Sequence, residues 1–194
     1  MTRLDIPISE DAIRKLEVGE NVSLYGTIVT ARDAGHKLMV EKSPDFVRPF
    51  IEEGVIYHCG PVMVHDKKGW RAAAAGPTTS IREEPYEARV IEDYRVRAVI
   101  GKGGMGKQTL AALERFGAVY LHAVGGAAVA IADSIKQIDD VFMLDEFGVP
   151  EAFWVMKVEG FKAIVTMDAH GKSLHDKVLR MSKSIRDMLI SPAS

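Results

Sequence analysis

The stretch VRAVIGKGGMGKQTLAALERFGAVYLHAVGG, residues 96–126, alternates short apolar runs with glycine-rich turns. Its first run, VRAVI, and a later run, AVYLHAV, have the apolar character that indicates buried strands. Between them, a glycine turn opens a segment from about Lys107 to Arg115 with the pattern of a helix. Strand, helix and strand in this order predict a layered α/β fold.

The chain on both sides of this stretch continues the alternation. NVSLYGTIVTA (residues 21–31) places Val22, Leu24 and Ile28 at a period of two, which predicts a strand, and RDAGHKLMVEK (32–42) is predicted to be a helix. We also expect a short helix capped by Ser9. After residue 126 the pattern predicts a helix in AAVAIADSI, strands in VFMLDEFG, AFWVMKVEG and FKAIVTMDAHG, and a closing helix in SLHDKVLRMSKSIRDML.

The region between residues 55 and 94 differs from the rest because it begins with consecutive predicted strands and no helix between them. VIYHC (55–59) and VMVHDKKGWRAAAAG (62–76) predict short strands with a hairpin turn at DKKG, and a polar helical segment ends near Tyr94. A hairpin among strand–helix units predicts a mixed sheet or two sheets. No linker rich in Pro, Gly or Ser divides the chain, so we expect a single domain over residues 1–194.

Composition narrows the classes of function. The chain has 194 residues, 47% hydrophobic content and a formal net charge of −2, which gives no reason to expect nucleic acid or an acidic membrane as partner. Its apolar runs are too short to span a bilayer, and we expect neither a signal peptide nor a membrane segment. The single cysteine, Cys59, cannot form an internal disulfide or hold an iron–sulfur cluster alone, and a cytoplasmic location is expected.

The glycine-rich loop resembles the phosphate-binding loop G-x-x-x-x-G-K-[ST] of nucleotide hydrolases. Gly101, Gly106 and Lys107 fit that motif, and VFMLDE (141–146) could be a magnesium-holding strand end. However, Gln108 stands where a hydroxyl should bind Mg²⁺, and Thr109 comes one position late. ATP binding is therefore kept only as a minor alternative. A glycine turn before a helix, with Lys102 and Lys107, predicts an anion site more generally.

Two other junctions carry similar chemistry. Arg32 lies where a strand meets a helix, and GPTTSIR (76–82) places Thr78, Thr79 and Arg82 at another helix start. Because guanidinium groups bind carboxylates through paired hydrogen bonds, these loops and Lys102 could converge on a small dicarboxylate. The alternatives are that Arg32 pairs with Asp33 or another acid, and that the threonines are helix caps.

The histidines give a weaker signal than the arginines. His36 is interpreted first as a structural histidine, although it lies close to Arg32 in the sequence. The remaining histidines show no metal-ligand spacing, so no metal site is predicted on this chain; they are His58, His65, His122, His170 and His175.

Several runs taken together resemble a known family. GTIVTARDAGH, GPTTSIREEPY, IGKGGM, FGVPEAFW and FKAIVTMDAHGKSL, in this order and spacing, are similar to the β-subunit, or C-terminal domain, of the iron–sulfur class I fumarases and the related L-tartrate dehydratases. The resemblance spans residues 8–174. It implies a three-layer β/β/α swivelling domain with mixed sheets, which closes over a [4Fe–4S] cluster held by a partner α-subunit. It also implies an α2β2 assembly.

The resemblance also implies roles for individual residues. The residues that would contact substrate are Arg32, Thr78, Thr79, Arg82 and Lys102. Among them, the catalytic residues would be Thr78, Lys102 and Arg32, and Thr78 would take part in proton transfer. Asp33 and His36 would lie behind them.

The implied reaction is the reversible hydration of fumarate to L-malate; L-tartrate dehydration and mesaconate hydration stay open, as does a non-catalytic assembly or regulatory role. The apolar stretch FMLDEFGVPEAFWVM (142–156) is expected to be core rather than a subunit interface.

Overall fold

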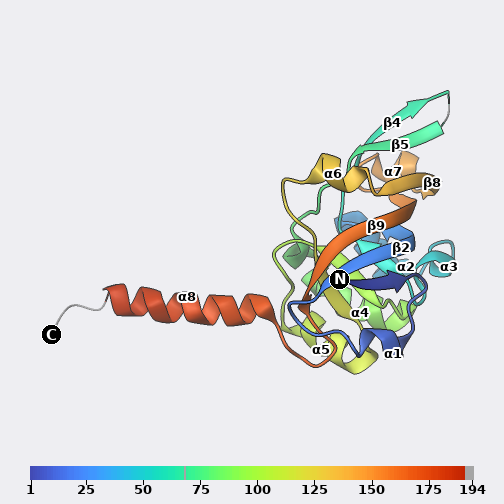
Figure 1. Cartoon of the computed structure of the whole chain (residues 1–194). Helices are drawn as coiled ribbons and strands as arrows, with labels where there is room; N and C mark the ends of the chain where they lie inside the picture. The colour runs from blue at the N-terminus through green and yellow to red at the C-terminus, as the bar shows by residue number, and fades with distance from the viewer. Residues whose placement is uncertain (68, 191–194) are drawn as a thin grey trace.

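The computed structural model describes residues 1–67 and 69–190 of the chain (Figure 1). Its elements, in chain order, are β1 (Thr2–Asp5), α1 (Glu10–Ile13), β2 (Asn21–Thr30), α2 (Asp33–Lys42), α3 (Arg48–Ile51), β3 (Val55–Tyr57), β4 (Val62–Asp66), β5 (Gly69–Ala74), the 3-10 helix η1 (Ser80–Glu83), α4 (Glu84–Tyr94), β6 (Ala98–Gly101), α5 (Lys107–Phe116), β7 (Val119–His122), α6 (Ala128–Ala132), β8 (Ile135–Phe142), α7 (Leu144–Phe147), β9 (Phe153–Met167) and α8 (Leu174–Ile190).

One main sheet organises the molecule, in the order β1-β2-β3-β6-β7-β9-β8. Strands β1, β2, β3, β6 and β7 run parallel to one another, whereas β9 runs antiparallel to β2, β7 and β8. Because β9 pairs with both β2 and β7, five strands close into a barrel-like ring. The mixed α/β class is thus confirmed, and the hairpin β4–β5 forms a second, two-stranded sheet beside the closed main sheet.

The alternation along each strand serves two hydrophobic cores. Within the ring, residues such as Ile28, Tyr57 and Ile100 point inward, and their neighbours Val29, Ile56 and Val99 point outward toward the helices. Helices α2, α3, α4 and α5 cover this outer core with Met39, Ile51, Tyr94 and Leu113, all fully buried. The helix layer therefore lies against one wall of the ring, behind the sheet in the view of Figure 1.

The long strand β9 replaces two predicted strands. AFWVMKVEG and FKAIVTMDAHG were expected to be separate, but the chain stays extended from Phe153 to Met167. Gly160, at φ 72°, absorbs the irregularity, and the register with β2 shifts between Leu24 and Tyr25. A left-handed residue inside a strand favours glycine, because other side chains are strained there.

The region after α6 also differs from prediction. AAVAIADSI was expected to be one helix, but α6 ends at Ala132 and β8 begins at Ile135. VFMLDEFG was expected to be a strand, yet only its first two residues belong to β8. Met143, at φ 60°, breaks the strand, and α7 follows. Strand β1 and helix α3 were not predicted.

The remaining elements agree with the sequence. Ser9 caps α1, the strands of the β4–β5 hairpin pair antiparallel, and α2, α4 and α5 lie where they were predicted. The DKKG turn includes residue 68, and the predicted domain includes residues 191–194, all of which lie outside the described residues. Phe153, Trp154, Val155 and Met156 are fully buried, so the apolar stretch that ends with them is largely core.

Helix α8 leaves the body of the molecule and projects away from it (Figure 1). None of its residues is buried. Across residues 1–67 and 69–190, no helix combines the length and apolar character needed to cross a membrane.

Candidate active site

The candidate site lies where the parallel strands end. Arg32 follows β2, His58 follows β3, Lys102 follows β6 and His122 is the last residue of β7. Hydrogen bonds keep these ends level, since His58 N donates to Ile100 O at 2.8 Å and Ala123 N donates to Gly101 O at 2.9 Å. Loops at the carboxyl ends of parallel strands are common places for ligands. The closed sheet therefore brings together segments that are distant in the sequence.

The threonine loop is held between two of these strand ends. Thr78 N donates to His58 O at 2.7 Å, and Lys102 N donates to Thr78 O at 3.2 Å. Thr79 and Lys102 also form an isolated parallel bridge. These backbone contacts place the predicted residues Thr78, Thr79 and Lys102 side by side. Neither threonine caps a helix, because Thr79 at the start of η1 makes no capping hydrogen bond through its side chain.

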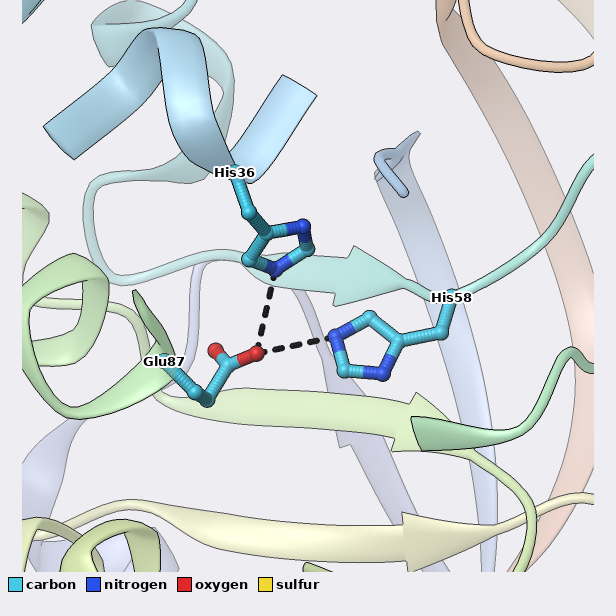
Figure 2. A group of neighbouring side chains, drawn as sticks. All are labelled: His36, His58 and Glu87. Carbon is cyan, nitrogen blue, oxygen red and sulfur yellow. Dashed lines mark hydrogen bonds and ion pairs between the residues drawn. The ribbon is translucent and has the colours of Figure 1, made fainter. Parts of the chain in front are cut away.

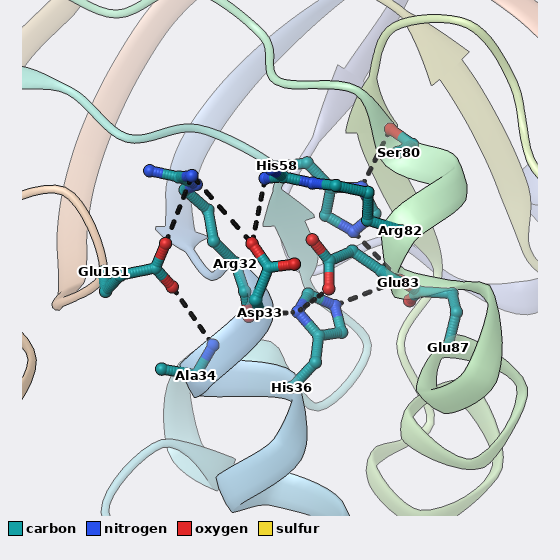
Figure 3. A network of polar contacts seen from close by, with 10 residues as sticks. All are labelled: Arg32, Asp33, Ala34, His36, His58, Ser80, Arg82, Glu83, Glu87 and Glu151. Carbon is teal, nitrogen blue, oxygen red and sulfur yellow. Dashed lines mark hydrogen bonds and ion pairs between the residues drawn. The ribbon is translucent and has the colours of Figure 1, made fainter.

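Arg32 lies under the loop that follows β3. Its Nη1 donates to Pro150 O at 3.3 Å, and its Nη2 pairs with Glu151 Oε1 at 3.2 Å (Figure 3). A Cβ at Gly60 would lie 2.6 Å from Arg32 Nη1 and 2.9 Å from the backbone oxygen of Pro150, so a larger residue there would displace the guanidinium group or the backbone. The second oxygen of Glu151 accepts from Ala34 N at 3.1 Å, which satisfies a donor in the first turn of α2.

Asp33 links the two arginines of the site. Its Oδ2 lies 2.9 Å from Arg82 Nη2 and 3.9 Å from Arg32 Nη2 (Figure 3). The expected alternative, that Arg32 pairs with nearby acids, is therefore realised through Asp33 and Glu151. The same contacts hold both guanidinium groups at the carboxyl end of β2, where Arg82 remains 46% exposed in its side chain.

Polar atoms without partners mark this region. Thr78 Oγ1 and Arg32 Nε are buried and have no hydrogen-bond partner among the described residues. Within residues 1–67 and 69–190, Lys102 Nζ likewise takes part in no hydrogen bond or ion pair. A buried polar group left unpaired costs about 1–3 kcal/mol, so such groups usually have a partner outside the chain or a functional role.

Behind the loops lies a fully buried triad of His36, Glu87 and His58 (Figure 2). Glu87 Oε2 lies 3.0 Å from His36 Nε2 and 2.9 Å from His58 Nε2. Burial acts to raise the pKa of Glu87, but the two imidazoles overcome it and hold the pKa at about 2. His36 is thus a satisfied buried histidine that faces the interior rather than a ligand.

Glu83, next to the triad, is a buried acid with no hydrogen-bond partner for either oxygen in the described part of the chain. The nearest ion-pair contact is to His36 Nδ1, at 3.8 Å. Burial raises the pKa of Glu83 to about 7, with His36 opposing the shift. The carboxyl group of Glu83 therefore takes up a proton more readily than an exposed glutamate does.

The glycine loop already holds an anion from the same chain. One oxygen of Glu84 accepts from Gly106 N at 2.6 Å and Thr109 Oγ1 at 2.7 Å, and the other accepts from Gln108 N at 2.9 Å. These donors at the start of α5 are the ones that a phosphate would use. In addition, the acids of VFMLDE lie in α7 rather than at a strand end. The geometry therefore argues against ATP binding in this loop.

We expect Glu84→Gln to lower the free energy of unfolding by about 2 kcal/mol, because an amide cannot accept on both sides as the carboxylate does. Urea unfolding of the full chain measures the change. Glu92→Gln is the matched control, since Glu92 is exposed on the same helix, α4. Equal unfolding midpoints for the two variants would contradict this role for Glu84.

The sequence did not identify the residues that support the site. They are His58, Ser80, Glu84 and Glu87. One signal was present: Glu83 and Glu87 lie four residues apart on the helical face that also carries the buried Val90 and Tyr94. Acids on a buried face need a partner, but nothing local in the sequence says which one.

The family described as "Fumarase C-terminus" matches residues 1–178. A Geobacillus stearothermophilus protein named as a class I fumarate hydratase is 51% identical over 181 residues, which cover 92% of this chain but 34% of that protein. This chain thus spans about a third of that relative.

Two further relatives are of similar length to this chain. A Methanocaldococcus jannaschii protein named as an L(+)-tartrate dehydratase subunit beta is 41% identical, with 88% of this chain and 89% of that protein covered. The L(+)-tartrate dehydratase subunit beta of Escherichia coli K12 is 34% identical, with 96% and 92% covered.

Proposed function

Because this chain belongs to the family of class I fumarate hydratase C-terminal domains and L-tartrate dehydratase β-subunits, a family of hydro-lyases, we propose that it is the β-subunit of an iron–sulfur hydro-lyase that interconverts fumarate and L-malate. The observation that carries the proposal is that loops at the carboxyl ends of the parallel strands carry two linked pairs: Arg32 and Arg82 share Asp33, and Thr78 and Lys102 are joined through their backbones. Three cations and one hydroxyl on these loops suit a substrate with a carboxylate at each end.

The residues of this chain do not fit a [4Fe–4S] cluster. Such a cluster requires three or four thiolates, whereas the chain has one cysteine, and burial raises the pKa of Cys59 to about 12. We therefore assign the cluster to a partner α-subunit, which the name "subunit beta" of the relatives supports. An α2β2 assembly, a cytoplasmic location and a three-layer domain that swivels over the partner belong to the same proposal.

In this proposal the chain supplies anion binding. Arg32 and Arg82 orient the substrate carboxylates, and Lys102 places a third positive charge where the loops meet. Removal of a proton next to a carboxylate builds negative charge on that carboxylate. Fixed cations in a site without water stabilise this charge more strongly than solvent does. Asp33 holds Arg82 in place, and Thr79 lines the loop beside Lys102.

Thr78 is the proton-transfer group of the proposal. A neutral hydroxyl is a weak base, so the neighbouring cations must lower the cost of its alkoxide form. Its Oγ1 is buried and makes no hydrogen bond to the described residues, which leaves it available to a substrate or to a group of the partner.

The test is reconstitution. The chain is co-expressed with a cluster-bearing α-subunit without oxygen, and the absorbance of fumarate is followed with fumarate or L-malate as substrate. Hydration by the complex, with little by either chain alone, is the expected result. Full activity of the partner alone would instead make this chain an assembly or regulatory subunit.

L-tartrate dehydration is the second candidate, because the relatives of similar length are named as tartrate dehydratase β-subunits. L-tartrate differs from L-malate by one hydroxyl, and mesaconate differs from fumarate by a methyl. A methyl group changes specificity by about 1–3 kcal/mol, whereas a site that hydrogen-bonds a hydroxyl can reject the substrate without it by about 10⁴-fold or more. A panel of fumarate, L-tartrate and mesaconate, compared by kcat/KM on the same complex, decides among them.

A further inference from the structure

A continuous chain of hydrogen bonds crosses the interior behind the candidate site. Figure 3 shows its central part, from Ser80 through His58 and Glu87 to His36. The successive contacts are Tyr120 Oη to Ser80 Oγ at 2.8 Å, Ser80 Oγ to His58 Nδ1 at 2.9 Å, His58 Nε2 to Glu87 Oε2 at 2.9 Å, Glu87 Oε2 to His36 Nε2 at 3.0 Å, and His36 Nδ1 to Arg32 O at 2.9 Å. Each of these five side chains is fully buried.

The acceptors in this chain fix where the protons lie. A carboxylate and a backbone carbonyl can only accept, and His36 faces one with each ring nitrogen. Both nitrogens of His36 must therefore carry a proton, which makes the ring an imidazolium. His58 donates through Nε2, and its Nδ1 accepts from Ser80, so His58 is neutral.

The surrounding charges agree with this assignment. Burial acts to lower the pKa of His36, but the Glu87 carboxylate outweighs it and raises the pKa to about 9. For His58, burial prevails over Glu87 and lowers the pKa. The other charged groups that face the triad are Glu83 and Arg82 from η1 and Asp33 from α2.

The spacing favours shared protons over a bound metal. The ligand atoms of the triad lie within 4.8 Å of one another, as in a metal site. However, two ligands of a tetrahedral zinc ion are about 3.4 Å apart, because each lies about 2.1 Å from the metal. Nitrogen–oxygen distances of 2.9 and 3.0 Å are those of hydrogen bonds.

We propose that His36, Glu87 and His58 are positioning residues, which lock the backbone of Arg32 at one end of the chain to Ser80, two residues after Thr78, at the other. The inference rests on the proposed function, because in that function Arg32 and Thr78 act on the same substrate. A displacement of about 1 Å between such groups can lower a rate by about 100-fold. A charged hydrogen-bond chain at full burial resists that displacement.

The test is Glu87→Gln in the full chain, measured first without substrate. A neutral amide cannot stabilise the His36 imidazolium as a carboxylate does, so His36 becomes neutral and the charged hydrogen bond to residue 87 is replaced at best by a weaker, neutral one. Nitrogen-15 NMR should show both His36 nitrogens protonated in the wild type at pH 7.5 and one unprotonated in the variant. Amide hydrogen exchange should rise at residues 31–36 and 76–82 together.

The second readout is kinetic, on the complex with the α-subunit. We expect kcat to fall at least tenfold and KM to change less than threefold, because positioning acts mainly on the transition state. Ser80→Ala is the milder second variant, which breaks the chain between His58 and Tyr120 without removing a charge. It should lower kcat severalfold and leave the His36 imidazolium intact.

Arg97→Lys is the control for simple destabilisation. Arg97 is 3% exposed and binds Phe116 O at 2.6 Å, but it precedes β6 at the end opposite Lys102. This variant should lose stability and keep kcat. The proposal is overturned by a neutral His36 in the wild type, by one equivalent of metal lost in Glu87→Gln, or by unchanged exchange in both loops. An inactive complex with the expected NMR and exchange results would count against the proposed function instead.

Discussion

Lys102→Met should lower kcat of the reconstituted complex by about 100-fold to 1,000-fold, which is the usual loss when a preorganised charge is removed from a reaction site. Lys102 Nζ has no ion pair or hydrogen bond across residues 1–67 and 69–190, so no contact within the chain explains its charge. Its backbone is nevertheless fixed on both sides, by Thr78 O and by Ser80 N at 3.1 Å. Methionine keeps an unbranched side chain that is one atom shorter, and it removes the ammonium group with its charge and donors.

The matched control for Lys102→Met is Lys107→Met. Lys107 belongs to the same glycine loop and is the lysine that fits the phosphate-loop motif, but it is exposed in the first turn of α5. We expect normal turnover for this variant. Iron and sulfide content should be wild type in both complexes, since the cluster is assigned to the partner. Near-normal kcat for Lys102→Met would remove Lys102 from the site.

Much of this site follows from sequence because it depends on local patterns. Arg32 and Lys102 come directly after predicted strands, and parallel strands align their carboxyl ends at one edge of a sheet. Once β2 and β6 are recognised as parallel strands of one α/β sheet, both residues are expected at the same edge of that sheet. The GPTTSIR motif adds Thr78, Thr79 and Arg82 as donors at a helix start, and the resemblance to the family implies that they contact substrate.

The rest depends on contacts between distant segments, which leave no local pattern. Glu87 meets His36 across 51 residues and His58 across 29. Glu84 reaches the glycine loop across 22 residues. The closure of the sheet by β9 is of the same kind, since a strand does not show in its sequence which two neighbours it pairs with. Apolar periodicity identifies strands and buried faces, but it does not identify partners.

Glu84 shows why a motif can mislead. The sequence correctly placed backbone donors and a positive dipole end at the start of α5, and it correctly expected an anion there. It could not show that the anion is a carboxylate from α4, 22 residues away. A phosphate loop requires those donors to be free, so this single contact decides between two functions that share one local pattern.

Thr78→Val separates catalysis from stability more sharply than any other change. Valine matches threonine in shape and replaces the hydroxyl by a methyl group. Because Thr78 Oγ1 makes no hydrogen bond to the described residues, its loss should change the free energy of unfolding by less than about 0.5 kcal/mol, whereas loss of a proton-transfer group should lower kcat by about 100-fold to 10,000-fold. Thr78→Ser, which keeps a hydroxyl, should recover most of the rate.

Thr109→Val supplies the reverse control. Thr109 Oγ1 donates to Glu84 Oε2 at 2.7 Å, so this hydroxyl is used within the fold and lies at the start of α5. The variant should lower the free energy of unfolding by about 1–2 kcal/mol and leave kcat of the folded complex unchanged. Urea unfolding and kcat, measured on both variants, therefore give opposite patterns if Thr78 acts on the substrate. If Thr78→Val instead loses stability and keeps its turnover, the buried hydroxyl has a structural partner and the proton-transfer group lies elsewhere, on the α-subunit.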